Sequence, residues 1–197
     1  MVTIKIIIGS TRPGRFGPKA AQWVYDMAKG RSDAQFMLVD LKEINLPFLD
    51  EEKHPMLHQY EHEHTKRWSR IVEDADGFIF VNPEYNLGVV APVKNALDFL
   101  YAEWKHKPLA FVSYGSSAGG KNAQQQVRNI VANLNMYDIA ESVIIVNYRN
   151  QMNERGEFIA TEQQNKAVAA MIEKLVFWAG QMQRARAELA GLGGRYT

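Results

Sequence analysis

Two arginines lie among glycines and hydroxyl side chains in the segment Gly9-Ser10-Thr11-Arg12-Pro13-Gly14-Arg15-Phe16-Gly17, between an apolar run and a segment with helical spacing. Free backbone N–H groups at the start of a helix attract an anion, and glycines let the backbone approach it closely. Arg12 or Arg15 can add charge-assisted hydrogen bonds. Neither Gly-Lys-Ser/Thr nor Gly-x-Gly-x-x-Gly occurs in this segment, which excludes those two nucleotide-binding patterns. The residues predict a site for a monophosphate or diphosphate group, with an ordinary glycine turn as the alternative.

A second group of polar side chains, Asn82-Pro83-Glu84-Tyr85-Asn86-Leu87-Gly88, follows the apolar run from Gly77 to Val81. Tyr85 offers a flat apolar face with a polar tip, and Asn86 has donors and acceptors for the edge of a heterocycle. These residues predict a surface for a ring. Glu84 could act as a general base, but no second carboxylate or histidine lies beside it in the sequence, which favours a structural hydrogen-bonding role.

A third segment of the same kind follows Tyr114. It runs Gly115-Ser116-Ser117-Ala118-Gly119-Gly120 and again leads into a helical pattern. Its glycines would let the backbone approach the other edge of the same ring.

Apolar runs alternate with helical patterns along the chain. Strands are expected at 4–8, 35–41, 78–81, 109–114 and 142–146, and the intervening helices begin near Pro18, Trp68, Pro92, Ala123 and Thr161. The last of these carries a capping box with Gln164. Such alternation predicts a parallel sheet with helices on both faces, whose ligands bind at the carboxyl ends of the strands. All three polar segments would lie at that edge.

The bulk properties are those of an ordinary globular domain. The chain has 197 residues, a net charge of +1 and no cysteine. We expect one domain over residues 1–190 with a flexible C-terminal tail over 191–197, and no pull toward nucleic acid or an anionic membrane. No secretory leader and no apolar run of about 18 residues is evident, so a cytoplasmic protein is expected.

Other chemistry-bearing residues fit simpler roles. Four histidines, at positions 54, 58, 62 and 64, fall in the irregular stretch from Lys42 to His64, but no zinc-binding motif accompanies them, so no metal site is expected. Trp68, Trp104 and Trp178 lie on apolar helical stripes and predict core packing, with an interface as the alternative for Trp104. Lys94 and Asp98 are spaced for an intrahelical ion pair.

Four stretches taken together, Gly9-Ser10-Thr11-Arg12, Pro83-Glu84-Tyr85-Asn86, Lys94-Asn95-Ala96-Leu97-Asp98 and Tyr114-Gly115-Ser116, resemble the NADPH-dependent FMN reductase family. The resemblance implies a flavodoxin-like three-layer sandwich with a five-stranded parallel sheet in the order 2-1-3-4-5. It implies that FMN phosphate is held by the segment carrying Ser10, Arg12, Phe16 and Gly17. It also implies an isoalloxazine ring against Pro83 to Asn86, with Gly115 and Ser116 on its far side, and a subunit contact at Lys94 and Asp98.

The resemblance further implies an FMN-dependent enzyme that passes hydride from NADPH or NADH through FMN to a flavin, quinone, azo or similar acceptor, usually as a homodimer or homotetramer. Because FMN would carry the chemistry, no catalytic side chain is expected. The cofactor-binding candidates are Ser10, Thr11, Arg12, Arg15, Phe16, Gly17, Pro83, Glu84, Tyr85, Asn86, Leu87, Gly88, Gly115, Ser116 and Gly119.

Two alternatives remain open on the sequence. The first is a flavodoxin-like electron carrier, which the near-neutral charge disfavours because such carriers are commonly very acidic. The second is a regulatory protein on the same fold, favoured only by the segment from Leu87 to Pro92, which departs from the family pattern.

Overall fold

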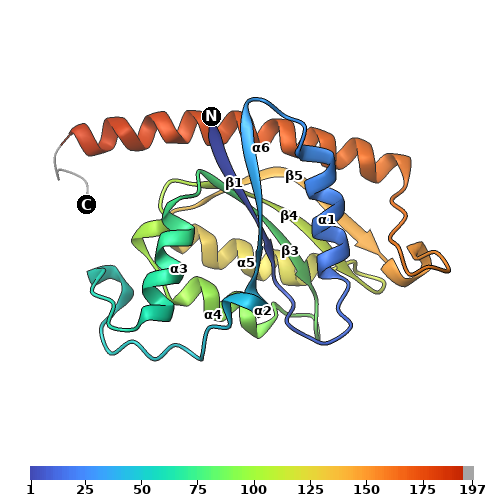
Figure 1. The fold of residues 1–197 in the computed structure, drawn as a ribbon, viewed down its shortest axis with the longest axis horizontal. Coiled ribbons are helices and arrows are strands. Elements are labelled where there is room, and N and C mark those ends of the chain that lie inside the picture. The colour runs from blue at the N-terminus through green and yellow to red at the C-terminus, as the bar shows by residue number, and fades with distance from the viewer. Residues whose placement is uncertain (193–197) are drawn as a thin grey trace.

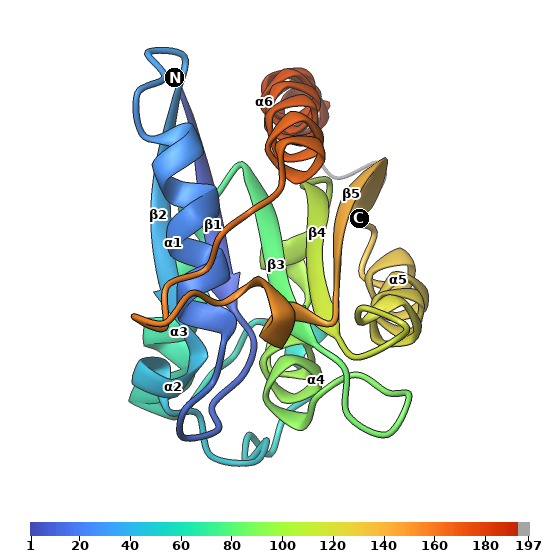
Figure 2. The same cartoon turned by 90° about the vertical axis from the view of Figure 1, so that its right-hand side faces the viewer.

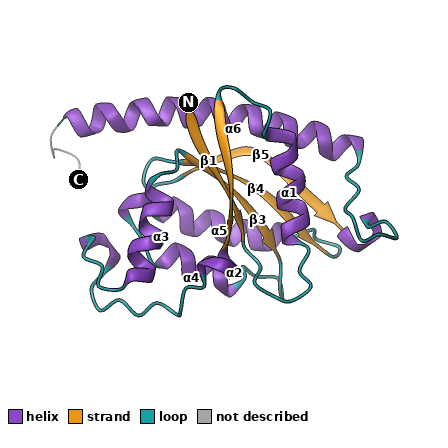
Figure 3. Ribbon diagram, viewed as in Figure 1, coloured by secondary structure: helices purple, strands orange, loops and turns teal. Residues whose placement is uncertain are grey.

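The computed structural model describes residues 1–192 and contains a five-stranded parallel sheet (Figures 1 and 3). The strands lie in the order β2-β1-β3-β4-β5, which confirms the predicted flavodoxin-like order 2-1-3-4-5. Their bounds are β1 (Val2–Ile8), β2 (Ala34–Asp40), β3 (Gly77–Pro83), β4 (Pro108–Gly115) and β5 (Tyr137–Val146). The order reverses between β1 and β3, where a ligand site is expected at the carboxyl edge.

Helices cover both faces of the sheet (Figure 2). On one face lie α1 (Gly17–Ala28) and α6 (Glu162–Gly191), and on the other α3 (Glu63–Glu73), α4 (Ala91–Asp98) and α5 (Lys121–Asn133). A single turn, α2 (Leu41–Ile44), follows β2, and three short 3-10 turns complete the set, η1 (Pro55–Leu57), η2 (Ala102–Trp104) and η3 (Tyr148–Gln151). The three layers are those predicted.

The central strands are buried on both faces, which is why their sequences are nearly continuous apolar runs. Trp68 and Trp104 are fully buried beside them, and their indole N–H groups donate to the carbonyl oxygens of Ala96 and Leu97 at 2.9 and 3.2 Å. Core packing is confirmed for both, and the interface alternative for Trp104 is wrong. The prediction of core packing is wrong for Trp178, which is 42% exposed and lies beside the edge strand β5.

Several element boundaries differ from those predicted. The segment 137–141 belongs to β5, but this edge strand alternates exposed and buried side chains and so lacks an apolar run. The helix after β3 ends at Asp98, and η2 forms separately. The helix expected near Trp68 begins earlier, at Glu63, because its first turn is polar in sequence and carries no apolar spacing. The final helix continues to Gly191, and the predicted tail, 191–197, falls almost wholly outside the described residues.

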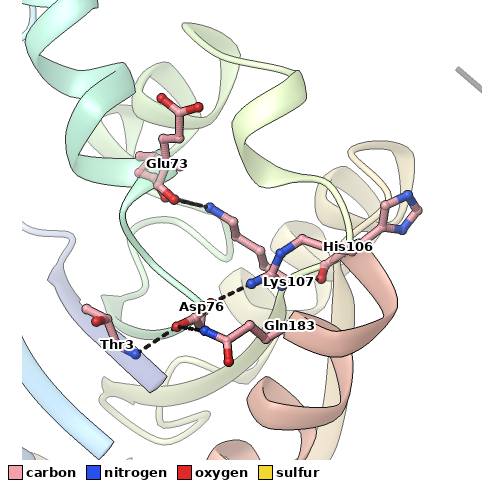
Figure 4. Close-up of polar contacts among 8 residues, drawn as sticks. Thr3, Glu73, Asp76, His106, Lys107 and Gln183 are labelled. Atoms are coloured by element: carbon pink, nitrogen blue, oxygen red, sulfur yellow. Dashed lines mark hydrogen bonds and ion pairs between the residues drawn. The ribbon is translucent and has the colours of Figure 1, made fainter. Parts of the chain in front are cut away.

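A polar network joins α6 to the amino edge of the sheet (Figure 4). The Asp76 carboxylate accepts hydrogen bonds from the backbone N–H of Thr3 at 3.0 Å, from Gln183 at 3.1 Å and from Arg186. Beside it the Lys107 ammonium, 5% exposed, donates to the carbonyl oxygens at the end of α3. These bonds fix the two layers at the edge opposite the predicted site.

Candidate functional site

A cavity of about 390 Å³ opens at the carboxyl edge of the sheet. The segments that follow β1, β3, β4 and β5 contribute its walls. Its lining residues are Ser10, Arg12, Arg15, Phe16, Pro83, Glu84, Tyr85, Tyr114, Gly115, Ser116, Asn147, Tyr148, Arg149 and Asn150. Nine of these are among the predicted cofactor-binding residues, so the structure brings the three predicted segments together. The volume is in the range usual for small-molecule sites.

The segment after β1 leads directly into α1 at the cavity. Phe16 occupies the N-cap position of α1, and no side chain caps the first turn. Because a Cβ atom on Gly17 would lie 2.9 Å from the Tyr114 hydroxyl, only glycine fits at this close approach. Pro18 has no N–H group, and the N–H groups of Lys19 and Ala20 donate to the Phe16 carbonyl oxygen at 2.9 and 3.3 Å, so in the first turn of α1 the N–H of Gly17 is the donor left for an anion.

The two arginines of this segment differ in their partners. Arg15 forms a paired hydrogen-bonded ion pair with the Asp40 carboxylate at the end of β2 and also donates to the carbonyl oxygen of Ser10. The hydrogen bond to Asp40 raises the pKa of the Arg15 guanidinium. Arg12 is exposed, makes no ion pair within residues 1–192, and lies with its guanidinium carbon 5.9 Å from the centre of the Tyr85 ring. Arg12 is thus the better placed of the two for a phosphate group.

The segment after β3 forms a tight turn from Tyr85 to Gly88. The backbone N–H of Tyr85 donates to Gly88 and the backbone N–H of Gly88 donates to Tyr85, at 3.2 and 2.9 Å. Asn86 and Leu87 between them have φ values of 51° and 61°, the pattern of a type I′ turn. Gln126 on α5 holds the turn by bonding to Val89 N and Leu87 O. Of the predicted ring-binding residues, Asn86, Leu87 and Gly88 do not line the cavity.

Glu84 uses its carboxylate to cap α5. It accepts hydrogen bonds from the backbone N–H groups of Asn122 and Ala123, at 2.8 and 3.2 Å, and from the Asn122 amide side chain at 3.0 Å. An anion at a helix N-terminus stabilises the helix. This is the structural hydrogen-bonding role that the sequence favours, and it fixes the segment after β3 relative to α5.

Gly115 and Ser116 line the cavity, whereas Gly119 does not. Gly119 has a φ of 60°, and a Cβ atom there would lie 2.4 Å from an Ile144 methyl group, so this glycine is required by the turn itself. Thr11 lies on the other side of its segment, in a second cavity of about 530 Å³ formed with Leu41 to Phe48 and the start of α4. Neither Gly119 nor Thr11 therefore lines the cavity at the carboxyl edge.

Two buried residues that line the cavity, Tyr114 and Ser10, carry hydroxyl groups. The Tyr114 side chain is 3% exposed, and within residues 1–192 its hydroxyl has no hydrogen-bond partner. Burial raises the pKa of Tyr114, so the phenol stays protonated and can donate. The Ser10 hydroxyl, equally buried, lies 3.0 Å from the Tyr85 hydroxyl. A buried donor without a partner is costly, which suits a site that binds a polar ligand group.

The segment 147–150 after β5 is a wall that the sequence interpretation missed. Tyr148 stacks on Phe16, with ring centres 4.5 Å apart, and the backbone N–H of Asn147 donates to Ser116 at 3.0 Å. The signal was present, because strand 142–146 was predicted and its carboxyl end must reach the same edge as the others.

The histidines of the 42–64 stretch belong to separate contacts. His58 faces Glu103 at 3.3 Å, and His64 faces Asp50 at 2.9 Å. Within residues 1–192 no three histidine or acidic side chains gather closely enough to hold a metal ion. In the same part of the chain no helix is both long and apolar enough to cross a lipid bilayer.

Fold and cavity together define a three-layer α/β protein with a cavity at the carboxyl edge of the sheet, where the strand order reverses. The chain belongs to the NADPH-dependent FMN reductase family, whose model matches residues 2–151. This confirms the resemblance recognised in the sequence motifs.

Known relatives agree with this assignment. A protein named NAD(P)H-dependent FMN reductase from Nectria sp is 42% identical over 131 residues, which is 63% of this chain and 65% of that protein. A protein of the same name from Schizosaccharomyces pombe is 45% identical over 124 residues, 62% of each chain. The chain thus spans somewhat less than two thirds of the length of these relatives. The flavoenzyme NAD(P)H:(acceptor) oxidoreductase of Paracoccus denitrificans has the same fold, with a TM-score of 0.72 at 21% identity over 92% of this chain and 99% of that one.

Proposed function

We propose that this protein is an FMN-dependent NAD(P)H oxidoreductase. The observation that carries the proposal is the shape of one cavity: Ser10, Arg12 and the start of α1 lie at the same opening as the Pro83–Tyr85 segment and the Gly115–Ser116 backbone. A ligand with a phosphate group and a flat heterocycle matches both sets of residues. FMN is such a ligand.

Each residue of the cavity has a distinct task toward FMN. Arg12, Ser10 and the backbone N–H of Gly17 hold the phosphate, and the Tyr114 hydroxyl donates to a polar atom of the cofactor. Pro83 and Tyr85 support the ring, and the backbone at Gly115 and Ser116 meets its edge. Bound FMN supplies the hydride chemistry, so the chain needs only to bind and orient. Glu84 is committed to α5 and is not proposed as a base.

The hydride donor is NADPH or NADH, and the acceptor is a small molecule such as a free flavin, a quinone or an azo compound. The exposed position of Tyr85, at 41%, leaves the outer side of the ring surface open to solvent, where donor and acceptor can bind in turn.

Cofactor content tests the proposal. Purified protein is expected to be yellow or to become yellow on reconstitution with FMN, and Arg12→Ala is expected to weaken FMN binding at least about tenfold because a charge-assisted hydrogen bond is lost. Arg155→Ala is the matched control, since Arg155 is exposed and lies outside the cavity. Colourless protein that FMN cannot reconstitute would contradict the proposal.

We also propose a cytoplasmic homodimer or homotetramer. The segment after α2 exposes Phe48 by 84%, Leu49 by 42%, Met56 by 59% and Leu57 by 57%, an apolar surface suited to a second copy of the chain. Light scattering of the eluting protein is expected to give two or four chain masses. A single chain mass at micromolar concentration is the contrary result.

A further inference from the structure

The charged side chains that line the cavity differ in whether another group of the protein compensates their charge. Three arginines and one carboxylate belong to the lining, namely Arg12, Arg15, Arg149 and Glu84. Arg15 is neutralised by Asp40, and Glu84 is engaged by the N-terminus of α5. Within residues 1–192 neither Arg12 nor Arg149 makes an ion pair. Two positive charges therefore face the cavity without a carboxylate partner in the described chain.

The backbone that carries Arg149 is held firmly in place. Asn147 has a φ of 47°, which turns the chain after β5, and its backbone N–H donates to the carbonyl oxygen of Ser116. The Gln151 side chain donates back to the carbonyl oxygen of Val146 at 3.2 Å. Arg149 is thus presented by a short 3-10 turn tied to the β4 segment at one end and to β5 at the other.

Tyr148 sets the position of this turn against the phosphate segment. Its ring stacks on Phe16 at an interplanar angle of 26° and lies edge-on to Tyr114, with ring centres 5.5 Å apart. Phe16 is the N-cap residue of α1 and itself lines the cavity. The residue next to Tyr148 is therefore anchored beside the anion-accepting start of α1.

We propose that Arg149 is a second cation of the cofactor phosphate site, in the place that the sequence suggested for Arg15. A terminal phosphate monoester carries a charge of about −1.5 to −2 near neutral pH. Arg12 and Arg149 together match that charge, whereas one arginine would leave it half compensated. The guanidinium of Arg149 offers two N–H groups to the phosphate oxygens. This inference rests on the proposed function, since it assumes that the cavity binds FMN.

Paired titrations with FMN and riboflavin test the inference, because riboflavin has the same ring system without the phosphate. Arg149→Ala is expected to raise the Kd of FMN about tenfold and to leave the Kd of riboflavin nearly unchanged. It is also expected to reduce the salt dependence of FMN binding, which a merely structural role would not do. Arg149→Lys keeps the positive charge but loses the paired N–H donors of the guanidinium, and it is expected to give a Kd for FMN between those of wild type and Arg149→Ala. Arg155→Ala is the matched control.

Three results would overturn the inference. One is an unchanged preference of Arg149→Ala for FMN over riboflavin. Another is an equal loss of both ligands, which would indicate damage to the cavity. The third is unchanged FMN binding with a raised KM for NADPH, which would assign Arg149 to the nicotinamide nucleotide. Failure of the proposed function is distinguishable, because wild-type protein would then either bind neither flavin or bind FMN that NADPH and NADH leave oxidised.

Discussion

The hydroxyl groups of Ser10 and Tyr85 lie 3.0 Å apart and join the segment after β1 to the segment after β3. These two residues are 75 positions apart in the chain, and both line the cavity. It couples the proposed phosphate-binding residues to the proposed ring-binding surface.

We predict that this contact contributes to the stability of the cofactor-free protein. Ser10→Ala and Tyr85→Phe each remove one hydroxyl, and a double-mutant cycle on the free energy of unfolding is expected to give a coupling of about 0.5–1 kcal/mol. Urea denaturation of the two single variants and the double variant measures it. Strictly additive effects would mean that the hydroxyl pair does not hold the segments together.

A second prediction concerns the turn after β3. Leu87 has a φ of 61° and is 67% exposed, so its side chain gains little from burial while its backbone is strained. Leu87→Gly is expected to raise the free energy of unfolding by about 0.5–1 kcal/mol, whereas Leu87→Val is expected to lower it by at least a similar amount, because a β-branched residue tolerates this region least. Thermal unfolding measures both. A change in the free energy of unfolding with the same sign in both variants would mean that the backbone at Leu87 is not strained.

A third prediction separates capping from catalysis at Glu84. Glu84→Gln removes the charge at the start of α5 and is expected to lower the free energy of unfolding by about 1 kcal/mol. The pH profile of turnover is expected to keep its shape, because the carboxylate does not transfer a proton. If Glu84→Gln lost turnover and its pH profile of turnover were shifted, Glu84 would instead be identified as an acid or base.

A fourth prediction concerns the buried ammonium of Lys107. Burial, reinforced by the charge of Arg186 and opposed by Asp76, Glu73 and Glu103, lowers the pKa of Lys107 from 10.5 to about 8. Because the folded state loses this proton more readily than the unfolded state, the contribution of Lys107 to stability rises with pH through this interval. Relative to Lys107→Met, the wild-type free energy of unfolding is expected to increase by about 2 kcal/mol between about pH 7 and about pH 9.5.

Denaturant unfolding of both proteins across that interval checks this prediction. Taking the difference between wild type and Lys107→Met removes the titrations that the two proteins share. A difference that stays constant, or that falls with rising pH, would mean that Lys107 keeps its ordinary pKa in the folded protein.

The sequence predicted a parallel sheet with helices on both faces and the edge at which the three polar segments lie, because apolar runs and glycine-rich segments are local features. The strand order 2-1-3-4-5 came from the family resemblance. It did not predict the pairing of Arg15 with Asp40, which depends on how β2 lies beside β1. It overlooked Arg149 because a polar connection gives no local sign of facing a cavity. It placed Trp178 in the core because helical spacing alone does not tell how much of a long helix the sheet covers.

Hydride transfer is the central claim, and an anaerobic titration of the FMN-reconstituted protein tests it most directly. NADPH or NADH is expected to bleach the yellow absorbance with one nicotinamide oxidised per flavin, and a quinone added afterwards is expected to restore the colour. Protein that binds FMN but keeps its yellow colour in excess NADPH and NADH would contradict the account and would favour an electron carrier.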